Sequence, residues 1–183
     1  SSAASDVYKR QAQQGVRTKV ISGDNPLTVS EVARRAGIPD AEKFVDARTL
    51  KTDAELAKAA EDMTVFGRVT PDQKKKLVAA MKRAGHTVAM TGDGTNDAPA
   101  LNFANVGLSM GSGTSVAKDA SDITLLDDSF ASIATAVMWG RSLYRNIQRF
   151  VLFQLTINFA AITICFIGAL FGTDMPLTVV QIL

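Results

Sequence analysis

The sequence predicts an α/β domain with a parallel sheet, followed by a long helix that continues into a membrane-spanning helix. Between residues 18 and 126, short β-prone apolar segments alternate with helical patterns. Such alternation is typical of a parallel sheet with helices on both faces. After residue 129, a helical pattern runs without a strong breaker into the uncharged segment 150–171. Together, these two observations predict the fold class.

The first predicted strand, residues 18–22, ends in an acidic loop. A helical pattern starts at Pro26, which suits the first helical turn. Asp24 or Asn25 would cap this helix by accepting a hydrogen bond from a backbone N–H group, and Gly37 ends it. The next elements predicted along the chain are a short helix at 53–60 and a strand at 65–69.

The segment after residue 69 repeats the same succession of cap, proline and glycine stop. Thr70 is the predicted cap, Pro71 takes the first helical position, and Gln73 completes an arrangement like a capping box. Gly85 ends this helix, and the apolar run 87–91 is predicted to be a buried strand. Two more strands are predicted, at 105–110 and 122–126.

Acidic loops follow two of the predicted strands, with the sequences ISGDN at 21–25 and MTGDGTND at 90–97. In parallel α/β sheets, ligands bind outside the carboxyl ends of the strands. Asp93 and Asp97 lie four residues apart across a glycine turn, so both could face one Mg²⁺ ion or its waters. The alternative is an ordinary turn that binds no ligand, because Asp, Asn and Gly are the usual turn residues. Two acidic strand ends in one chain favour the functional interpretation.

A phosphate site beside Mg²⁺ also needs a fixed cation, for which Lys74 is the candidate. It lies in the first helical turn, whereas at least one of Lys75 and Lys76 is expected on a solvated helix face. Ser22 offers a hydroxyl and a backbone N–H group for one phosphate oxygen. We expect Lys74 and Asp93 to converge around one phosphoryl group. No convincing nucleophile motif occurs in the chain, so the accepting group is expected on a strand upstream of residue 1.

The uncharged segment 150–171 is long enough to cross a bilayer and is apolar on all faces. The alternative is a buried core helix. Arginines at 141, 145 and 149 precede the segment, and basic residues mark the cytoplasmic side, which places residues 15–149 in the cytoplasm. Residues 172–183 are predicted to form a turn and the start of a second membrane segment. Residues 1–14 have no periodic apolar face, so we expect a disordered or foreign leader.

The composition argues against several other classes of protein. The net charge of +2 is small, and no basic cluster is interleaved with aromatic residues, so no nucleic-acid partner is expected. Cys165 is the only cysteine and His86 the only histidine. A disulfide framework, a cysteine-based zinc site and a metal site with several histidines are therefore excluded.

Three motifs resemble P-type cation-transporting ATPases, which belong to the haloacid-dehalogenase-like phosphotransferases. They are MTGDGTNDAPAL at 90–101, ISGDN at 21–25, with Ser22 for the usual threonine, and GRVTPDQK at 67–74. The resemblance covers roughly residues 15–183. It implies a Rossmann-like, haloacid-dehalogenase-like sheet in a partial phosphorylation domain. The implied boundaries are 15–128 for that domain, 129–149 for a stalk helix and 150–171 for a transmembrane helix.

The resemblance also implies an aspartyl-phosphate intermediate that is formed from ATP. Asp93 would then bind Mg²⁺, with Asp97 and Asn96 supporting the metal and the phosphate. Lys74 would neutralise the phosphoryl group, and Ser22 would contact it. The remaining residues implied to bind the cofactor are Gly23, Asp24 and Arg68, with Asp24 near the nucleotide and Arg68 holding the pocket.

The segment 106–159 resembles calcium pumps of the plasma-membrane type. In those pumps the asparagine after the sequence F-Q-L-T-x is an ion ligand, and Asn158 matches it. Ala161 stands where calcium pumps of the endoplasmic reticulum have a glutamate, which implies one transported ion. The alternative for Asn158 is an interhelical hydrogen bond. Residues 16–90 instead resemble a different bacterial subgroup.

The family's DKTGT motif, its actuator motif TGE and its nucleotide-binding domain do not occur in the chain. The resemblance therefore implies a pump fragment that does not act alone. Its partners would be the rest of the pump, a lipid bilayer and a transported cation, Ca²⁺. Two alternatives remain open, a soluble Mg²⁺-dependent phosphatase of the same superfamily and a non-catalytic membrane-anchored module that binds Mg²⁺.

Overall fold

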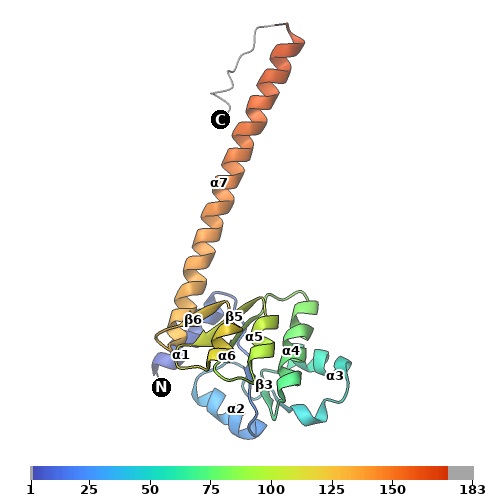
Figure 1. The fold of residues 1–183 in the computed structure, drawn as a ribbon, viewed down its shortest axis with the longest axis vertical. Coiled ribbons are helices and arrows are strands. Elements are labelled where there is room, and N and C mark those ends of the chain that lie inside the picture. Colours follow the sequence, from blue (N-terminus) through green and yellow to red (C-terminus); the bar gives the residue numbers. More distant parts are fainter. Residues whose placement is uncertain (1, 173–183) are drawn as a thin grey trace. The chain divides into compact units, whose positions relative to one another are not determined.

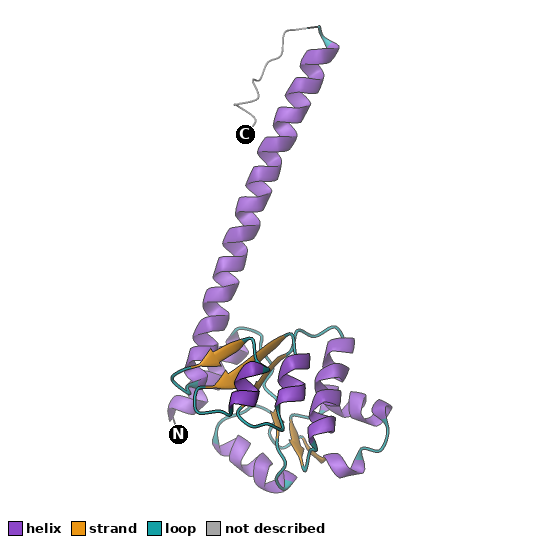
Figure 2. Ribbon diagram, viewed as in Figure 1, coloured by secondary structure: helices purple, strands orange, loops and turns teal. Residues whose placement is uncertain are grey.

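The computed structural model describes residues 2–172 of the 183-residue chain. The predicted start of a second membrane segment lies almost wholly outside these residues. The chain divides into two compact units, Ser1–Thr135 and Ala136–Leu183, and each is described by itself. Figure 1 shows the order of the elements along the chain, and Figure 2 shows their types.

All strand pairs in the first unit are parallel, which confirms the predicted fold class. Hydrogen bonding arranges the strands in two three-stranded sheets instead of one. In the first sheet, β3 lies between β1 and β2, and in the second, β5 lies between β4 and β6. The strands are β1 (Val20–Ile21), β2 (Phe44–Asp46), β3 (Val65–Gly67), β4 (Ala89–Gly92), β5 (Val106–Met110) and β6 (Ile123–Leu125).

The helices of this unit connect successive strands, as the sequence predicts. The two predicted caps are confirmed: Asn25 accepts from the Leu27 N–H group, and Thr70 forms a capping box with Gln73. The short strand β2 and the last two helices of this unit were not predicted. The helices are α2 (Pro26–Arg35), α3 (Asp53–Asp62), α4 (Pro71–Arg83), α5 (Ala98–Phe103) and α6 (Ser115–Asp119), with a 3₁₀ turn η1 at Ala47–Thr49.

Helix α4 packs against the apolar residues of both sheets. Leu77 belongs to the core cluster around Phe66 of β3, whereas Val78 belongs to the cluster around Met90 of β4. Met81 contacts both clusters. Leu77 and Val78 are at most 1% exposed, so the helix is held firmly against both sheets. Its first turn, which carries Lys74, is thereby fixed near the strand ends.

The structure differs from the expectation of a disordered leader at residues 1–14. Residues Ser2–Gln13 form helix α1. Gln11 is buried and its side chain accepts a hydrogen bond from the Thr18 hydroxyl, with 3.2 Å between the oxygens. Tyr8 packs against the core cluster around Val29. These few contacts produce no apolar periodicity that could be recognised in the sequence, which suggested a disordered or foreign leader.

Helix α7 (Phe130–Leu170) joins the predicted stalk and the predicted membrane segment in one uninterrupted helix of 41 residues. It is the one helix within residues 2–172 that is long and apolar enough to cross a membrane. Ala161 is the only buried residue of α7, although the core helix of a soluble protein would be mostly buried. The length, composition and exposure of α7 therefore fit a membrane span better than a core helix.

Candidate functional site

Lys74 and Asp97 form a largely buried ion pair between the start of α4 and the loop after β4. The Nζ atom of Lys74 lies 2.6 Å from Oδ1 of Asp97, and the two side chains are only 15% and 11% exposed. The second carboxylate oxygen, Oδ2, accepts a hydrogen bond from the Gly94 N–H group. Charged groups that are removed from water need partners of this kind. The pair therefore holds the ammonium group of Lys74 in one place.

Gly92 makes this ion pair possible. A Cβ atom at position 92 would lie 2.5 Å from Cβ of Asp97, a separation that real Cβ atoms do not adopt. The missing side chain at Gly92 therefore makes room for the side chain of Asp97.

Asp93 is exposed at the carboxyl end of β4. Its backbone oxygen accepts a hydrogen bond from the Thr114 N–H group at 2.9 Å. Within residues 2–172, its carboxylate forms no hydrogen bond or ion pair, so its two oxygens are available to a ligand. A Cβ atom at Gly113 would lie 3.1 Å from the Asp93 backbone oxygen. The glycine loop after β5 therefore packs against Asp93, a contact that was not predicted from the sequence.

The ligands available around Asp93 suit Mg²⁺ better than a metal ion that is enclosed entirely by protein ligands. No group of three or more His, Cys, Asp or Glu residues within 2–172 could hold a metal ion. Mg²⁺ keeps several waters and usually takes one or two carboxylates together with substrate phosphates. Asp93 can supply such a carboxylate. Asp97 has both oxygens engaged in the structure, which suits it to holding Lys74. Asn96 is exposed in the same loop.

Ser22 and Asp24 form a small hydrogen-bonded turn at the end of β1. The Ser22 hydroxyl accepts from the Asp24 N–H group and donates to the Asp24 carboxylate, both at 3.1 Å. The Ser22 N–H group, which we expected to contact phosphate, donates instead to the Phe66 oxygen of β3. The single hydroxyl donor is engaged too, by Asp24, so it reaches a ligand only by leaving that carboxylate. A Cβ atom at Gly23 would meet no heavy atom within 4 Å, so this turn is open.

Backbone contacts link the Ser22 turn to Lys74. The Val69 N–H group donates to the Ser22 oxygen at 3.0 Å, and Val69 directly precedes Thr70, the N-cap of α4. Lys74, one turn further along α4, contacts Asp97. Its neighbours differ from it, because Lys75 lies over the Phe103 ring and Lys76 pairs with Asp53 at the surface. Of the three lysines, only Lys74 contacts the loop after β4 through an ion pair.

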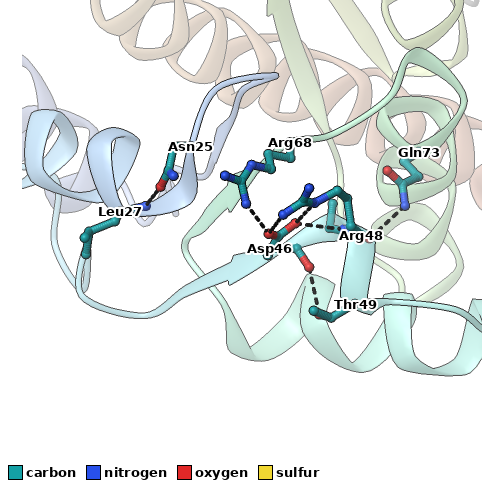
Figure 3. A network of polar contacts seen from close by, with 8 residues as sticks. Asn25, Leu27, Asp46, Arg48, Thr49, Arg68 and Gln73 are labelled. Carbon is teal, nitrogen blue, oxygen red and sulfur yellow. Dashed lines mark hydrogen bonds and ion pairs between the residues drawn. The ribbon is translucent and has the colours of Figure 1, made fainter.

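Arg68 belongs to a second polar network, beyond the ends of β2 and β3 (Figure 3). Asp46 accepts a hydrogen bond from Arg68 Nη1 at 2.8 Å and two from the Arg48 guanidinium, at 2.9 and 3.2 Å. The hydrogen bonds from Arg48, with a further contribution from Arg68, hold the pKa of the Asp46 carboxyl well below its usual range. Neither Asp46 nor Arg48 was predicted from the sequence, which shows no motif around them.

Asn158, the predicted cation ligand, lies in α7. Its side chain is half-buried and forms no hydrogen bond within the described part of the chain. The hydroxyls of Thr156 and Thr163 on the same helix donate to helix carbonyls four residues earlier, each at 2.8 Å. Among these three polar side chains, only the Asn158 amide is therefore without a partner within α7.

Comparison with known proteins identifies relatives of two kinds. Residues 2–105 match the model of the haloacid dehalogenase-like hydrolase family. The plasma-membrane-type calcium-transporting ATPase 8 of Arabidopsis thaliana is 47% identical over 178 residues, which cover 92% of this chain and 17% of that protein. Calcium-transporting ATPase 5 of rice, Oryza sativa subsp. japonica, is 46% identical over 97% of this chain and 17% of that protein. The chain thus spans about a sixth of the length of these relatives.

Two solved structures share the fold. A zinc-transporting PIB-type ATPase in the E2·Pi state superposes with a TM-score of 0.68 and 24% identity, over 93% of this chain and 23% of that one. The catalytic domain of the CPx-ATPase CopB-B has a TM-score of 0.57 and 23% identity, over 73% of this chain and 44% of that domain. Because the family match spans more than half of the chain, the protein belongs to the haloacid dehalogenase-like hydrolases, and it is homologous to P-type calcium-transporting ATPases.

Proposed function

We propose that this chain is part of an ATP-driven, P-type Ca²⁺ pump and supplies the phosphate- and Mg²⁺-binding side of its phosphorylation site. The observation that carries the proposal is the buried pair between Lys74 and Asp97, next to the exposed carboxylate of Asp93. A fixed ammonium group beside a free carboxylate, at the carboxyl ends of parallel strands, suits phosphoryl transfer. The similarity to calcium-transporting ATPases supports the choice of reaction and of ion.

Each residue of the site has a distinct part in this proposal. Lys74 neutralises charge on the transferring phosphoryl group, and its pairing with Asp97 holds it ready to do so. The Ser22 hydroxyl turns from the Asp24 carboxylate, to which it donates in the structure, and donates to a phosphoryl oxygen instead. Asp93 and, through the same loop, Asn96 hold Mg²⁺, which supplies positive charge to the phosphate oxygens. Gly23, Asp24 and Arg68 lie on the ATP side.

The two sheets have edge strands that could pair with a strand from another part of the pump, and this strand would carry the residue that accepts the phosphoryl group. β1 and β4 are terminal strands of their sheets, and α4 packs against apolar residues of both sheets. Edge strands expose unpaired backbone groups, which a further strand can satisfy. We propose that a strand between β1 and β4 carries the phosphorylated aspartate close to Lys74 and Asp93.

A chimeric pump tests the proposal. In this chimera, the chain replaces the aligned 178 residues of the Arabidopsis calcium-transporting ATPase 8. Membranes that contain it are expected to form an acid-stable, hydroxylamine-sensitive phosphoenzyme from ATP when Ca²⁺ is present. The parent pump is the positive control. If the chimera reaches the membrane but no phosphoenzyme forms, the chain is not an active part of such a pump, and the non-catalytic module becomes the better hypothesis.

The substitution Asn158→Ala tests the proposed Ca²⁺ ligand in the same chimera. Removal of one oxygen ligand is expected to raise the Ca²⁺ concentration for half-maximal phosphorylation by about tenfold or more. Phosphorylation by inorganic phosphate without Ca²⁺ should persist, because it does not need the cation site. Thr156→Val is the matched control, since the Thr156 hydroxyl is already satisfied by Leu152 of its own helix. Unchanged Ca²⁺ dependence in Asn158→Ala would exclude the ligand role.

A further inference from the structure

Asp46 joins two arginines that lie at the carboxyl ends of neighbouring strands. Asp46 is the last residue of β2, Arg68 directly follows β3, and Arg48 lies in the turn η1. Figure 3 shows both guanidinium groups directed at the one carboxylate. With two positive charges and one negative charge, the trio carries a net charge of +1. The strand ends therefore keep a positive charge, although a carboxylate lies at the centre of the network.

The backbone of Arg68 is strained. Its φ angle is 53°, in the left-handed region that residues other than glycine avoid. Two contacts hold it there: its N–H group donates to the Asp24 oxygen at 2.8 Å, and its guanidinium binds Asp46. Strained residues persist only where the surroundings over-determine them, and they cluster at ligand-binding sites. The strained backbone is thus a second observation, beside the ion pairs, that indicates a functional position for Arg68.

Arg68 still has donors for a ligand. A guanidinium group has five N–H donors, and Asp46 uses one of those of Arg68. The side chain of Arg68 is 36% exposed, whereas that of Asp46 is 20% exposed. Asp46 therefore lies deeper and holds the guanidinium, while the remaining donors can reach an anion.

The support of Asp46 extends to the first turn of α4. Gln73 Nε2 donates to the Ala47 oxygen at 2.9 Å, and the Thr49 hydroxyl donates to the Asp46 oxygen at 2.7 Å. Gln73 directly precedes Lys74 in α4. The first turn of α4 thus fixes both the backbone next to Asp46 and the side chain of Lys74. The Asp46 network and the Lys74 ion pair are therefore linked through this helix turn.

We propose that Asp46 is a positioning residue that holds Arg68, together with Arg48, to bind an anionic group of the nucleotide. The inference rests on the proposed function, which places Arg68 on the ATP side. A guanidinium that is already held in its binding geometry loses less freedom when the ligand arrives. Asp46 thus strengthens ATP binding through Arg68 and does not touch the reacting atoms.

The test is Asp46→Asn in the chimeric pump, with Asp53→Asn as the matched control. Asp53 also pairs with a basic residue, Lys76 at 3.0 Å, but on the exposed surface. Asp46→Asn is expected to raise the ATP concentration for half-maximal phosphorylation by about tenfold. Phosphorylation by inorganic phosphate, which needs no nucleotide, should stay unchanged, and Asp46→Glu should recover part of the loss. Asp53→Asn should match the unaltered chimera in both reactions.

A double mutant shows whether Asp46 acts through Arg68 or independently of it. If Asp46 acts through Arg68, Asp46→Asn combined with Arg68→Ala should need no more ATP than Arg68→Ala alone. Additive losses, an unchanged ATP dependence, or equal loss of both phosphorylation reactions would overturn the inference. If the proposed function itself is wrong, the unaltered chimera will form no phosphoenzyme, and this result distinguishes the two failures. In that case, direct titration of ATP binding to the same variants still decides the role of Asp46.

Discussion

Replacement of Asp93 by asparagine is expected to abolish Mg²⁺-dependent phosphorylation of the chimeric pump. Asparagine keeps the shape of the side chain but removes the charge that a hard divalent cation requires. The carboxylate of Asp93 is exposed and unpaired within residues 2–172, so the substitution breaks no contact there that stabilises the fold. We expect the initial rate of phosphoenzyme formation from ATP to fall by at least about a hundredfold, measured over a range of Mg²⁺ concentrations.

The control for this experiment is Asp62→Asn, which removes an exposed carboxylate at the end of α3. This variant should match the unaltered chimera at every Mg²⁺ concentration. If Asp93→Asn formed phosphoenzyme at the rate of the unaltered chimera, Asp93 could not be the Mg²⁺ ligand. A reduced rate that recovered fully at high Mg²⁺ would show weakened binding of the metal and would support the assignment.

Lys74→Ala is expected to have two effects that can be measured separately. The first is a fall of about a hundredfold or more in the rate of phosphorylation, because a fixed positive charge at the transferring group is lost. The second is a loss of stability, because Asp97 keeps a largely buried negative charge without its partner. Breaking a buried pair in this way costs about 3 kcal/mol or more. Resistance to proteolysis during heating measures the second effect.

The double substitution Lys74→Ala with Asp97→Ala distinguishes the two effects. It removes both charges, so it should recover much of the stability but none of the activity. Lys76→Ala is the matched control, because its ion pair with Asp53 is exposed and such pairs contribute little. If the double variant recovered phosphorylation, Lys74 would act only by stabilising the fold, and its proposed contact with the phosphoryl group would be wrong.

Much of the architecture could be predicted because its signals are local. The capping box of Thr70 and Gln73 and the proline that follows the cap involve residues at most three positions apart, and the structure confirms them. The uncharged segment 150–171 likewise indicates a membrane helix from composition alone. The strand β2 escaped prediction because its two apolar residues, Phe44 and Val45, lie between the charged residues Lys43 and Asp46 and form no apolar run.

The sequence suggested which types of residue lie at the candidate site, but not which of these residues contact one another. Lys74 and Asp93 were expected to converge, whereas the structure pairs Lys74 with Asp97 of the same loop. Gly92, which lacks a side chain, leaves the space that the Asp97 side chain occupies. The N–H group of Ser22 was expected to face a phosphate, but the pairing of β1 with β3 uses it.

Local patterns in the chain were thus sufficient for the alternation of strands and helices and for the membrane helix. Contacts between distant segments were not, because a linear pattern contains no measure of which strand ends become neighbours. Lys74 and Asp97 lie 23 positions apart and Asp46 and Arg68 lie 22 apart. Buried apolar residues pack α4 against the parallel strands. This packing brings the two side chains of each pair together.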